Sequence, residues 1–318
     1  MGLSQPRRIC FIRPTGKDWG VGRMTAAESD ALFETLLASA QRLSFDSRNP
    51  LVCDVDPADD HRHGMTPEWS PLFGTPLWAE MSEAERVRLT RAEVAQFLGV
   101  GIWLEVGLQV ALLRASHSAD PSRPDVKFLL NECADENLHS LMFVDVIESI
   151  GSHCHPHDRM LKFFGWLFRH FAWGEVAYGI VLAGEEIFDV MQRDWMASDD
   201  VAAPIRRSSY IHVVEESRHM AYARRQIRDR LVGISRLRRF ISTMILASGT
   251  HLIARTLINR RVYEELGLDW DVVRSNIDAN EHHRMMFRKA AEPFIEFLSK
   301  EGLLNFGARW IYRKSNLL

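Results

Sequence analysis

The chain has 318 residues, of which 46% are hydrophobic and 25% are charged, the composition of a globular protein with a substantial core. Its net charge of −3, with no basic stripe interleaved with aromatic residues, gives no reason to expect nucleic acid or an anionic membrane surface as a partner. The four cysteines are widely separated and form no C-x-x-C pair. This spacing argues against a disulfide framework or a zinc ribbon and favours a reducing, cytoplasmic location.

Before residue 82 the sequence predicts an irregular N-terminal extension. Apolar residues recur at helical spacing only in residues 26–43, so we expect one helix there. Residues 49–76 are rich in Asp, Pro, His and Gly, which is typical of a long connection. The extension, residues 1–81, is therefore predicted to wrap a core that later residues form.

Long helical patterns with short links follow from Ser82 onward. Ser82 and Glu85 have the spacing of a capping box, which predicts the start of a helix. The longest apolar stretch, residues 98–113, is shorter than a membrane span and carries Glu105, so no membrane partner is expected. The predicted helices cover residues 82–117, 125–151, 156–196, 204–233, 235–266 and 278–301, with a break allowed at Pro293.

The predicted fold class is all-α, because no alternation of apolar and polar residues is long enough to build a sheet. We expect a single domain, residues 1–318, with about seven helices. Four helices in residues 82–232 form its core, and about three additional helices include those of the C-terminal residues 233–318.

The pattern Glu-x-x-His occurs twice, as Glu136 with His139 and as Glu216 with His219. Three residues along a helix correspond to roughly 300°, so the two side chains of each motif project from one face. Each motif lies in the middle of a predicted long helix and beside apolar positions, which disfavours surface salt bridges. Two such helices that face each other would surround a common point with two carboxylates and two imidazoles.

The other two core helices each place a carboxylate within an apolar segment. Glu105 has apolar neighbours nearly all round its helix, where an unpaired carboxylate is costly and should find a cation. Glu185 and Glu186 interrupt a second such segment. We favour Glu185, because apolar residues surround its face, and keep Glu186 as the alternative. The helices thus supply Glu, Glu-x-x-His, Glu and Glu-x-x-His, the order found in ferritin-like di-iron and di-manganese carboxylate proteins.

A third histidine shares the face of the second motif. His212 precedes Glu216 by four residues, which gives the pattern H-x-x-x-E-x-x-H. Glu216 and His219 both lie within roughly 40° of His212 around the helix, so His212 offers a third imidazole to one metal ion. Mixed carboxylate and imidazole ligands suit iron better than calcium or a structural zinc.

With this residue the sequence resembles the di-iron arylamine N-oxygenases of the p-aminobenzoate N-oxygenase type, from about Glu93 to Arg230. The resemblance implies a ferritin-like core that holds two iron ions. It also implies an O2-dependent oxidation of an amine to a hydroxylamine or nitro product, as in antibiotic biosynthesis. No arginine lies on the helix faces nearest Glu105, so we expect a larger or less acidic amine than p-aminobenzoate. At matching positions the resemblance implies the metal ligands Glu105, Glu136, His139, Glu185, His212, Glu216 and His219.

Two other functions share part of this pattern. A radical-generating, C-hydroxylating or desaturating di-iron oxidoreductase would carry both Glu-x-x-His motifs without His212. A radical enzyme would also need a redox tyrosine, for which Tyr178 is the candidate. Ferritin-like iron oxidation or storage is less expected, because storage chains are usually shorter. No Gly-rich dinucleotide motif is found, so a separate electron donor is expected, either a ferredoxin with its reductase or a chemical reductant. A homodimer is the default assembly.

Two groups of residues stay outside the predicted ligand set. His153, His155 and His157 resemble a metal site, but their position between two predicted helices favours a solvated loop. Glu132 lies one turn before Glu136 on the same face. There it either orients a ligand or forms the solvated end of the polar stripe.

Overall fold

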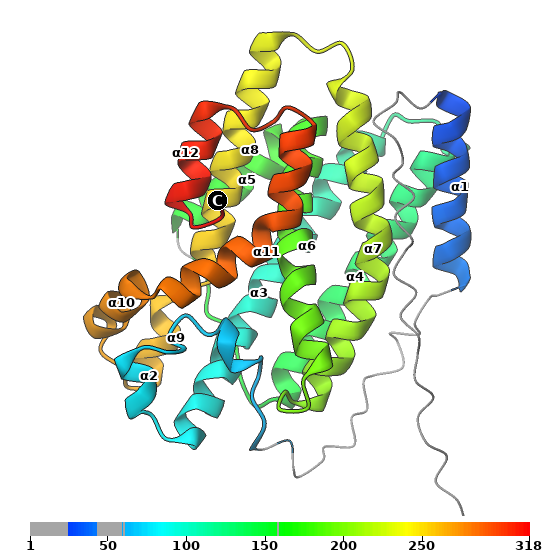
Figure 1. Ribbon diagram of the computed structural model, residues 1–318. Helices are drawn as coiled ribbons and strands as arrows, with labels where there is room; N and C mark the ends of the chain where they lie inside the picture. Colours follow the sequence, from blue (N-terminus) through cyan, green and yellow to red (C-terminus); the bar gives the residue numbers. More distant parts are fainter. Residues whose placement is uncertain (1–24, 43–58, 60, 158) are drawn as a thin grey trace, which may run out of the picture.

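The computed structural model describes residues 25–42, 59, 61–157 and 159–318. These residues form helices and connecting loops and contain no strand, so the predicted all-α class is confirmed. Four long helices run side by side through the centre of the molecule and form the ferritin-like core (Figure 1). They are α3 (Glu83–Ser116), α4 (Pro124–Ser149), α6 (Gly174–Ala197) and α7 (Ala203–Leu231). Contacts of α3 with α4 and α6, and of α7 with α4 and α6, close this bundle.

Helix α3 begins at the predicted capping box. The Ser82 hydroxyl accepts a hydrogen bond from the backbone N–H of Glu85, and the Glu85 carboxylate accepts one from the backbone N–H of Ser82 at 2.7 Å. This reciprocal pair satisfies two backbone donors that a helix start would otherwise leave free. The capping box therefore fixes the end of the helix that carries Glu105.

The single helix expected over residues 156–196 is wrong, because the chain breaks at Ala172 and Trp173. Helix α5 (Arg159–Phe171) ends there and α6 begins. The guanidinium of Arg114, on α3, donates hydrogen bonds to the backbone carbonyls of Arg169 and Ala172 at this break. Those carbonyls lie at the end of α5, where no helical donor remains. A tertiary contact thus ends α5 inside a continuous apolar pattern.

The C-terminal helices also differ from the predicted ranges. The expected helix 235–266 is divided into α8 (Arg236–Thr256) and α9 (Arg260–Glu265), since Asn259 caps the start of α9 through the backbone N–H of Arg261 at 3.0 Å. Pro293 lies inside α11 without interrupting it. The remaining elements are α10 (Trp270–Ala279), α11 (Glu281–Lys300) and α12 (Phe306–Lys314). Helices α8 and α11 pack on α6, and α12 packs on α8.

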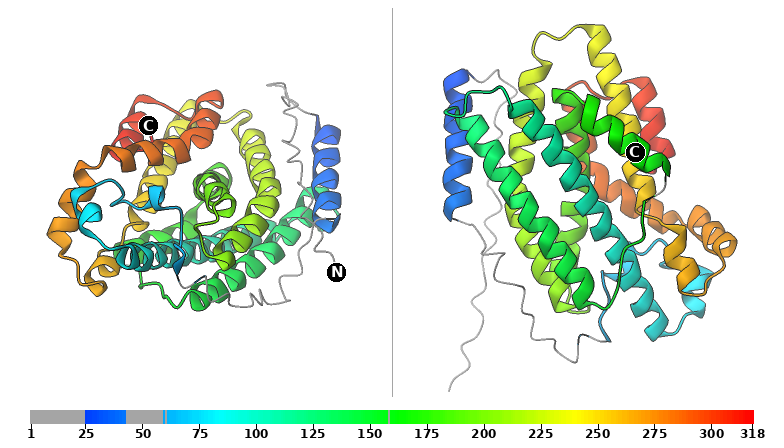
Figure 2. Two further views of the ribbon diagram at one scale, coloured as in Figure 1. Left: turned by 60° about the horizontal axis from the view of Figure 1, so that its bottom comes forward. Right: turned by 180° about the vertical axis from the view of Figure 1, so that it is seen from behind.

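The described part of the N-terminal region packs on the bundle and on the C-terminal helices. Helix α1 (Ala26–Arg42) lies at one edge beside α4 and α7 (Figure 2). The short helices η2 (Pro67–Trp69) and α2 (Pro76–Glu80) contact α11 and α10, respectively. The other parts of the predicted extension, residues 1–24, 43–58 and 60, lie outside the described residues, and its wrapping of the core stays a prediction.

Among the described residues, two stretches are long and apolar enough to span a membrane by length and composition alone, Glu83–Arg114 and Arg236–Glu265. In their most apolar windows, 56% and 39% of the residues are buried inside the protein. The first stretch lies in α3, where Glu105 is buried in the bundle. This is the arrangement of a core helix, because a charged residue facing lipid would be costly.

Glu93 joins two apolar clusters at one end of α3. The larger cluster fills the bundle, and the smaller one lies between α2, α9, α10 and the start of α3. One oxygen of Glu93 accepts hydrogen bonds from Tyr263 at 2.9 Å and from Ser70 at 3.2 Å. Burial raises the pKa of Glu93 to about 8, so the folded protein holds this carboxyl protonated at neutral pH.

Glu93→Gln is therefore expected to change how stability depends on pH. Because the folded pKa of about 8 lies above the ordinary value of 4.5, the protonated carboxyl contributes its full stability below pH 4.5. That contribution is lost as the pH rises through 8. Glutamine keeps an acceptor and does not ionise, so the free energy of unfolding of the variant should gain more than about 1 kcal/mol over wild type between pH 5 and 8. Urea unfolding at both values measures this difference, and parallel curves would contradict it.

Candidate metal centre

The four central helices bring all seven predicted ligands together inside the bundle. Helix α3 carries Glu105, α4 carries the first Glu-x-x-His motif, α6 carries Glu185, and α7 carries His212 with the second motif. None of these residues is more than 5% exposed, although all seven are acids or imidazoles. They are Glu105, Glu136, His139, Glu185, His212, Glu216 and His219.

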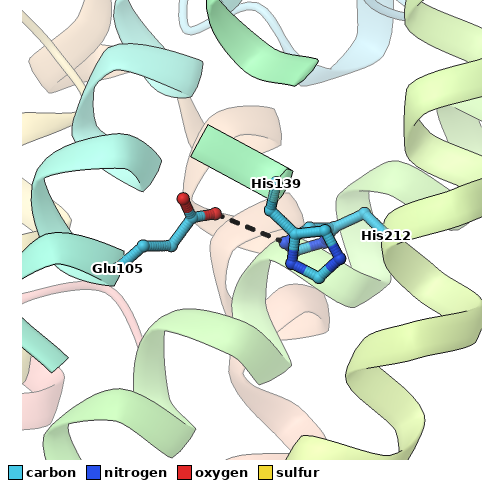
Figure 3. A group of neighbouring side chains, drawn as sticks. All are labelled: Glu105, His139 and His212. Carbon is cyan, nitrogen blue, oxygen red and sulfur yellow. Dashed lines mark ion pairs between the residues drawn. The ribbon is translucent and has the colours of Figure 1, made fainter. Parts of the chain in front are cut away.

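His212 faces three carboxylates from three different helices. Its Nε2 atom lies 3.8 Å from Glu105 Oε1, 3.8 Å from Glu185 Oε2 and 3.7 Å from Glu216 Oε1. Figure 3 shows Glu105 pointing toward His212, with His139 beside it. The ring centroids of His139 and His212 are 4.8 Å apart. The three distances from His212 Nε2 to carboxylate oxygens are too long for good hydrogen bonds, but they leave room for a cation shared among these ligand atoms.

The remaining imidazoles meet at Glu136 and Glu216. Glu216 Oε1 lies 3.2 Å from His139 Nδ1 and 3.0 Å from His219 Nδ1, while Glu136 Oε1 lies 3.2 Å from His219 Nδ1. Glu216 therefore contacts all three histidines of the cluster, including His212. Glu216 could therefore hold metal ions together with the histidines of both motifs and His212.

The donor atoms of this cluster are buried and largely lack hydrogen-bond partners within the described residues. Unpaired buried polar atoms cost free energy, and several that face one another indicate a place for cations. Four carboxylates would balance the charge of two divalent ions. The unpaired atoms include Glu105 Oε1, both carboxylate oxygens of Glu136, His139 Nδ1, Glu185 Oε2, His212 Nε2 and Glu216 Oε2. The residues present thus fit a site for metal ions.

Electrostatics in the metal-free cluster agree with this arrangement. Burial, together with the neighbouring carboxylates, raises the pKa of Glu185 well above its ordinary value, and burial likewise raises the pKa of Glu105. Burial acts in the same direction on Glu216, but His219 and the other imidazoles outweigh it and hold its pKa well below the ordinary value. The cluster thus holds protons in positions that cations could take.

The two adjacent glutamates of α6 have different surroundings. Glu185 lies in the cluster, with its Oε2 atom 3.8 Å from His212 Nε2. Glu186 accepts a hydrogen bond of 2.8 Å from Arg224 Nε on α7 and is therefore already neutralised. The geometry places Glu185, rather than its neighbour, among the candidate ligands.

Glu132 lies inside the bundle and not at a solvated end of the stripe. Its side chain is 1% exposed, and it forms a compact group with Glu136 and His219. Its Oε2 atom has no hydrogen-bond partner in the described part of the chain, and burial raises the pKa of Glu132 well above the ordinary value. Glu132 is therefore close enough to the cluster to act as an additional carboxylate.

Each motif histidine contacts an acid from the opposite helix, and the sequence prediction did not include these acids. His139 Nε2, on α4, lies 2.7 Å from Glu215 Oε2 on α7. In return, His219 Nε2 on α7 lies 3.4 Å from Asp135 Oδ2 on α4. Both acids directly precede the glutamate of a motif. This position in the sequence is the signal from which they could have been predicted. Such partners fix the orientation of a ligating imidazole and leave its other nitrogen for the metal.

His212 and Arg218 complete this outer layer. His212 Nδ1 lies 2.7 Å from Gln192 Oε1, so its Nε2 atom is turned toward the carboxylates. The buried guanidinium of Arg218 lies 3.8 Å from Glu215 and 3.9 Å from Asp135. One cation thus compensates two acids that do not enter the cluster.

Glu215→Gln should weaken metal binding by about 10- to 100-fold, the range usual for loss of such an outer partner. The amide is isosteric, but it removes the charge that orients and polarises His139. A chelator competition with Mn2+ would measure the change, with the exposed Glu292→Gln of α11 as a matched control. Equal affinities of the two variants would show that Glu215 does not orient His139.

The histidine-containing link between α4 and α5 lies away from this cluster. His153 Nε2 and His155 Nε2 lie 3.1 and 3.0 Å from Glu265 Oε2 at the end of α9. The side chains of His153 and Glu265 are 61% and 49% exposed, as a solvated loop predicts.

Tyr178, the candidate for a redox tyrosine, is buried, with its hydroxyl 3.4 Å from that of Tyr222.

The fold and this cluster define an all-α protein with buried glutamate and histidine groups that could hold metal ions. The family model of the p-aminobenzoate N-oxygenase AurF matches residues 26–302, and the chain belongs to this oxygenase family. Uncharacterised proteins of Mycobacterium bovis and Mycobacterium tuberculosis are similar to it, with 28% identity over 201 residues. The match covers 62% of this chain and 58% of those relatives, so the chain spans less than two thirds of their length.

Proposed function

We propose that this protein is an O2-dependent di-iron N-oxygenase that converts an arylamine into a hydroxylamine or nitro product in the biosynthesis of a natural product. The observation that carries the proposal is the buried set of four glutamates and three histidines, in which Glu216 contacts every histidine. Membership of the N-oxygenase family supports the same reaction.

Each of the residues has a distinct task in this proposal. Glu105, Glu136, Glu185 and Glu216 neutralise two iron ions, while His139, His212 and His219 supply neutral donors. The iron ions, when bound, supply the electrons and coordination sites that activate O2. The Phe143 ring packs against one of the ligands, with its centroid 5.0 Å from that of His212, and covers that side of the cluster with apolar surface.

The first oxidation balances as RNH2 + O2 + 2 e− + 2 H+ → RNHOH + H2O. The two electrons come from outside the chain, so a ferredoxin with its reductase, or a chemical reductant, completes the reaction. We place the enzyme in the cytoplasm, where a reducing environment keeps iron ferrous and agrees with the free thiols of Cys133 and Cys154. A homodimer is the proposed assembly.

Anaerobic reconstitution with ferrous iron, followed by desalting and iron analysis, tests the proposal. We expect close to two iron ions per chain, and a panel of arylamines with 18O2 should then give a product that contains labelled oxygen. One iron ion per chain would contradict the seven-ligand set and implicate Glu105 or Glu185. No iron in a folded protein would overturn the oxygenase proposal.

A further inference from the structure

A cavity of about 490 Å3 opens beside the carboxylate cluster, and the oxygenase proposal leaves its role unassigned. Segments of α3, α5, α6 and α8 enclose it, and Glu185 is one of its lining residues. The Oε2 atom of the same side chain lies 3.8 Å from His212 Nε2, so the cavity reaches one residue of the candidate ligand cluster. Its volume is in the range that holds a drug-sized molecule.

The wall of this cavity is almost entirely apolar. Of its lining residues, Glu185 and Arg169 are the ionisable ones, and Ser248 adds a hydroxyl. Arg169 lies near the end of α5 and is partly exposed. Beyond these three, the wall consists of aliphatic and aromatic side chains and glycine, with the backbone of small residues.

The outer rim of the cavity is apolar as well. Phe164 and Phe171 of α5 and Ile245 of α8 line it and are 39%, 61% and 38% exposed. Most of the deeper lining residues are buried, among them Leu108, Val176 and Ile253. A molecule that enters between α5 and α8 therefore meets apolar surface from the rim to Glu185.

These features define which amines can reach the cluster. A carboxylate placed along the apolar wall would lose its hydration, and the one cationic side chain of the lining, Arg169, lies away from most of the wall, near the end of α5. An alkylamine is protonated at neutral pH and would also have to lose its hydration along the wall before it reached Glu185, whereas an arylamine is neutral. Each methylene group buried on the wall adds to binding.

We propose that this cavity is the binding site for the apolar body of an uncharged arylamine, whose amino group points toward Glu185 and whose distal end lies at the rim between α5 and α8. The chemical class is an arylamine with an aliphatic or aromatic extension and no carboxylate. The oxidation of this molecule rests on the proposed function, but its binding does not.

Competition with the fluorescent arylamine N-phenyl-1-naphthylamine tests the binding on the metal-loaded protein under anaerobic conditions. Butyl 4-aminobenzoate should displace this probe at a concentration at least tenfold lower than 4-aminobenzoate, which differs by its free carboxylate. Methyl 4-aminobenzoate should fall between them, because it buries fewer methylene groups. Equal displacement by the acid and the butyl ester, or no binding of the probe, would overturn the proposal.

Gly107 offers a way to shorten the cavity without disturbing its wall. A Cβ atom at Gly107 would meet the Phe168 ring at 3.8 Å, an ordinary contact, so a larger side chain can extend into the space. A Cβ atom at Gly165 or Gly249 would instead overlap Trp103 or lie 2.7 Å from Ile180. Gly107→Leu should therefore reduce the preference for the butyl over the methyl ester at least fivefold. An unchanged ratio in a variant of wild-type thermal stability would show that the ester lies elsewhere.

Arg169→Gln and turnover assays separate the remaining outcomes. If Arg169 captured a substrate carboxylate, its replacement would weaken binding of 4-aminobenzoate, and that result would overturn the uncharged class. The proposal expects no change in the already weak binding of the acid. Tight binding of the butyl ester without oxygenation of any amine would leave this proposal standing and remove the oxygenase function. Efficient oxygenation of the acid in preference to the ester would support the oxygenase function and overturn the proposal of an uncharged substrate.

Discussion

If the proposed di-iron N-oxygenase function holds, Glu185→Ala is expected to lose at least one of the two iron ions and to lower the oxygenation rate by about a hundredfold or more, whereas Glu186→Ala keeps both properties. The two residues are adjacent on α6 and both buried, yet only Glu185 contacts His212, at 3.8 Å. Glu186 instead accepts a hydrogen bond from Arg224. Iron per chain after anaerobic loading and desalting, together with the rate of product formation, measures the difference.

Glu186→Ala controls for the loss of a buried carboxylate on the same helix. Its partner Arg224 is 36% exposed, so the freed guanidinium can be hydrated and the helix should remain in place. Loss of iron from both variants to the same extent would indicate a general disturbance of α6. Loss from Glu186→Ala alone would reverse the assignment of the two glutamates.

The sequence allowed the central part of the site to be predicted because its residues violate the ordinary rules of a helix core. Glu105 lies in a segment that is apolar nearly all round, and the i, i+3 spacing sets Glu136 and His139 on one face of their helix. Both signals are local and need no knowledge of neighbouring helices. The structure brings these residues together with the second motif inside one bundle.

The outer layer could not be predicted in the same way, because it depends on which helices face each other. Glu215 and Asp135 are acids next to motif glutamates, a position that on one isolated helix is read as solvated surface. Glu215 on α7 contacts His139 on α4, and Asp135 on α4 contacts His219 on α7. Only the packing of the two helices against each other defines these contacts. Sequence spacing sets faces of one helix and leaves the pairing of helices open.

The break between α5 and α6 has a similar cause. Residues on either side of Trp173 continue an apolar helical pattern, and the hydrogen bonds that end α5 come from Arg114, more than fifty residues earlier in the chain. The cavity beside Glu185 follows from this break, since α5 departs from the line of α6 and supplies one wall. Local propensity therefore predicted the helical class but not the place where this cavity opens.

Removal of the metal ions is expected to lower the melting temperature of the protein by at least about 5 °C. Without cations, buried oxygens of Glu105, Glu136 and Glu185 lack hydrogen-bond partners among the residues that the structure describes, and unpaired groups of this kind destabilise a folded core. A ligand present at a thousand times its dissociation constant stabilises the folded state by about 4 kcal/mol, and a single kcal/mol shifts the melting temperature of a large domain by about 2 °C.

Thermal unfolding of the Mn2+-loaded and the chelated protein measures this shift, since Mn2+ occupies such sites without reacting with O2 in the assay. The shift should disappear in Glu136→Ala, which removes a carboxylate from the cluster, and should persist when His153 and His155 are replaced together. Those two histidines belong to the exposed group with Glu265, which could also retain a divalent ion. If the double histidine variant lost the shift and Glu136→Ala kept it, the stabilising ion would lie at the surface. Stabilisation that depends on Glu136 instead ties the metal to the folding of the bundle, because only the packed helices bring its ligands within reach of one another.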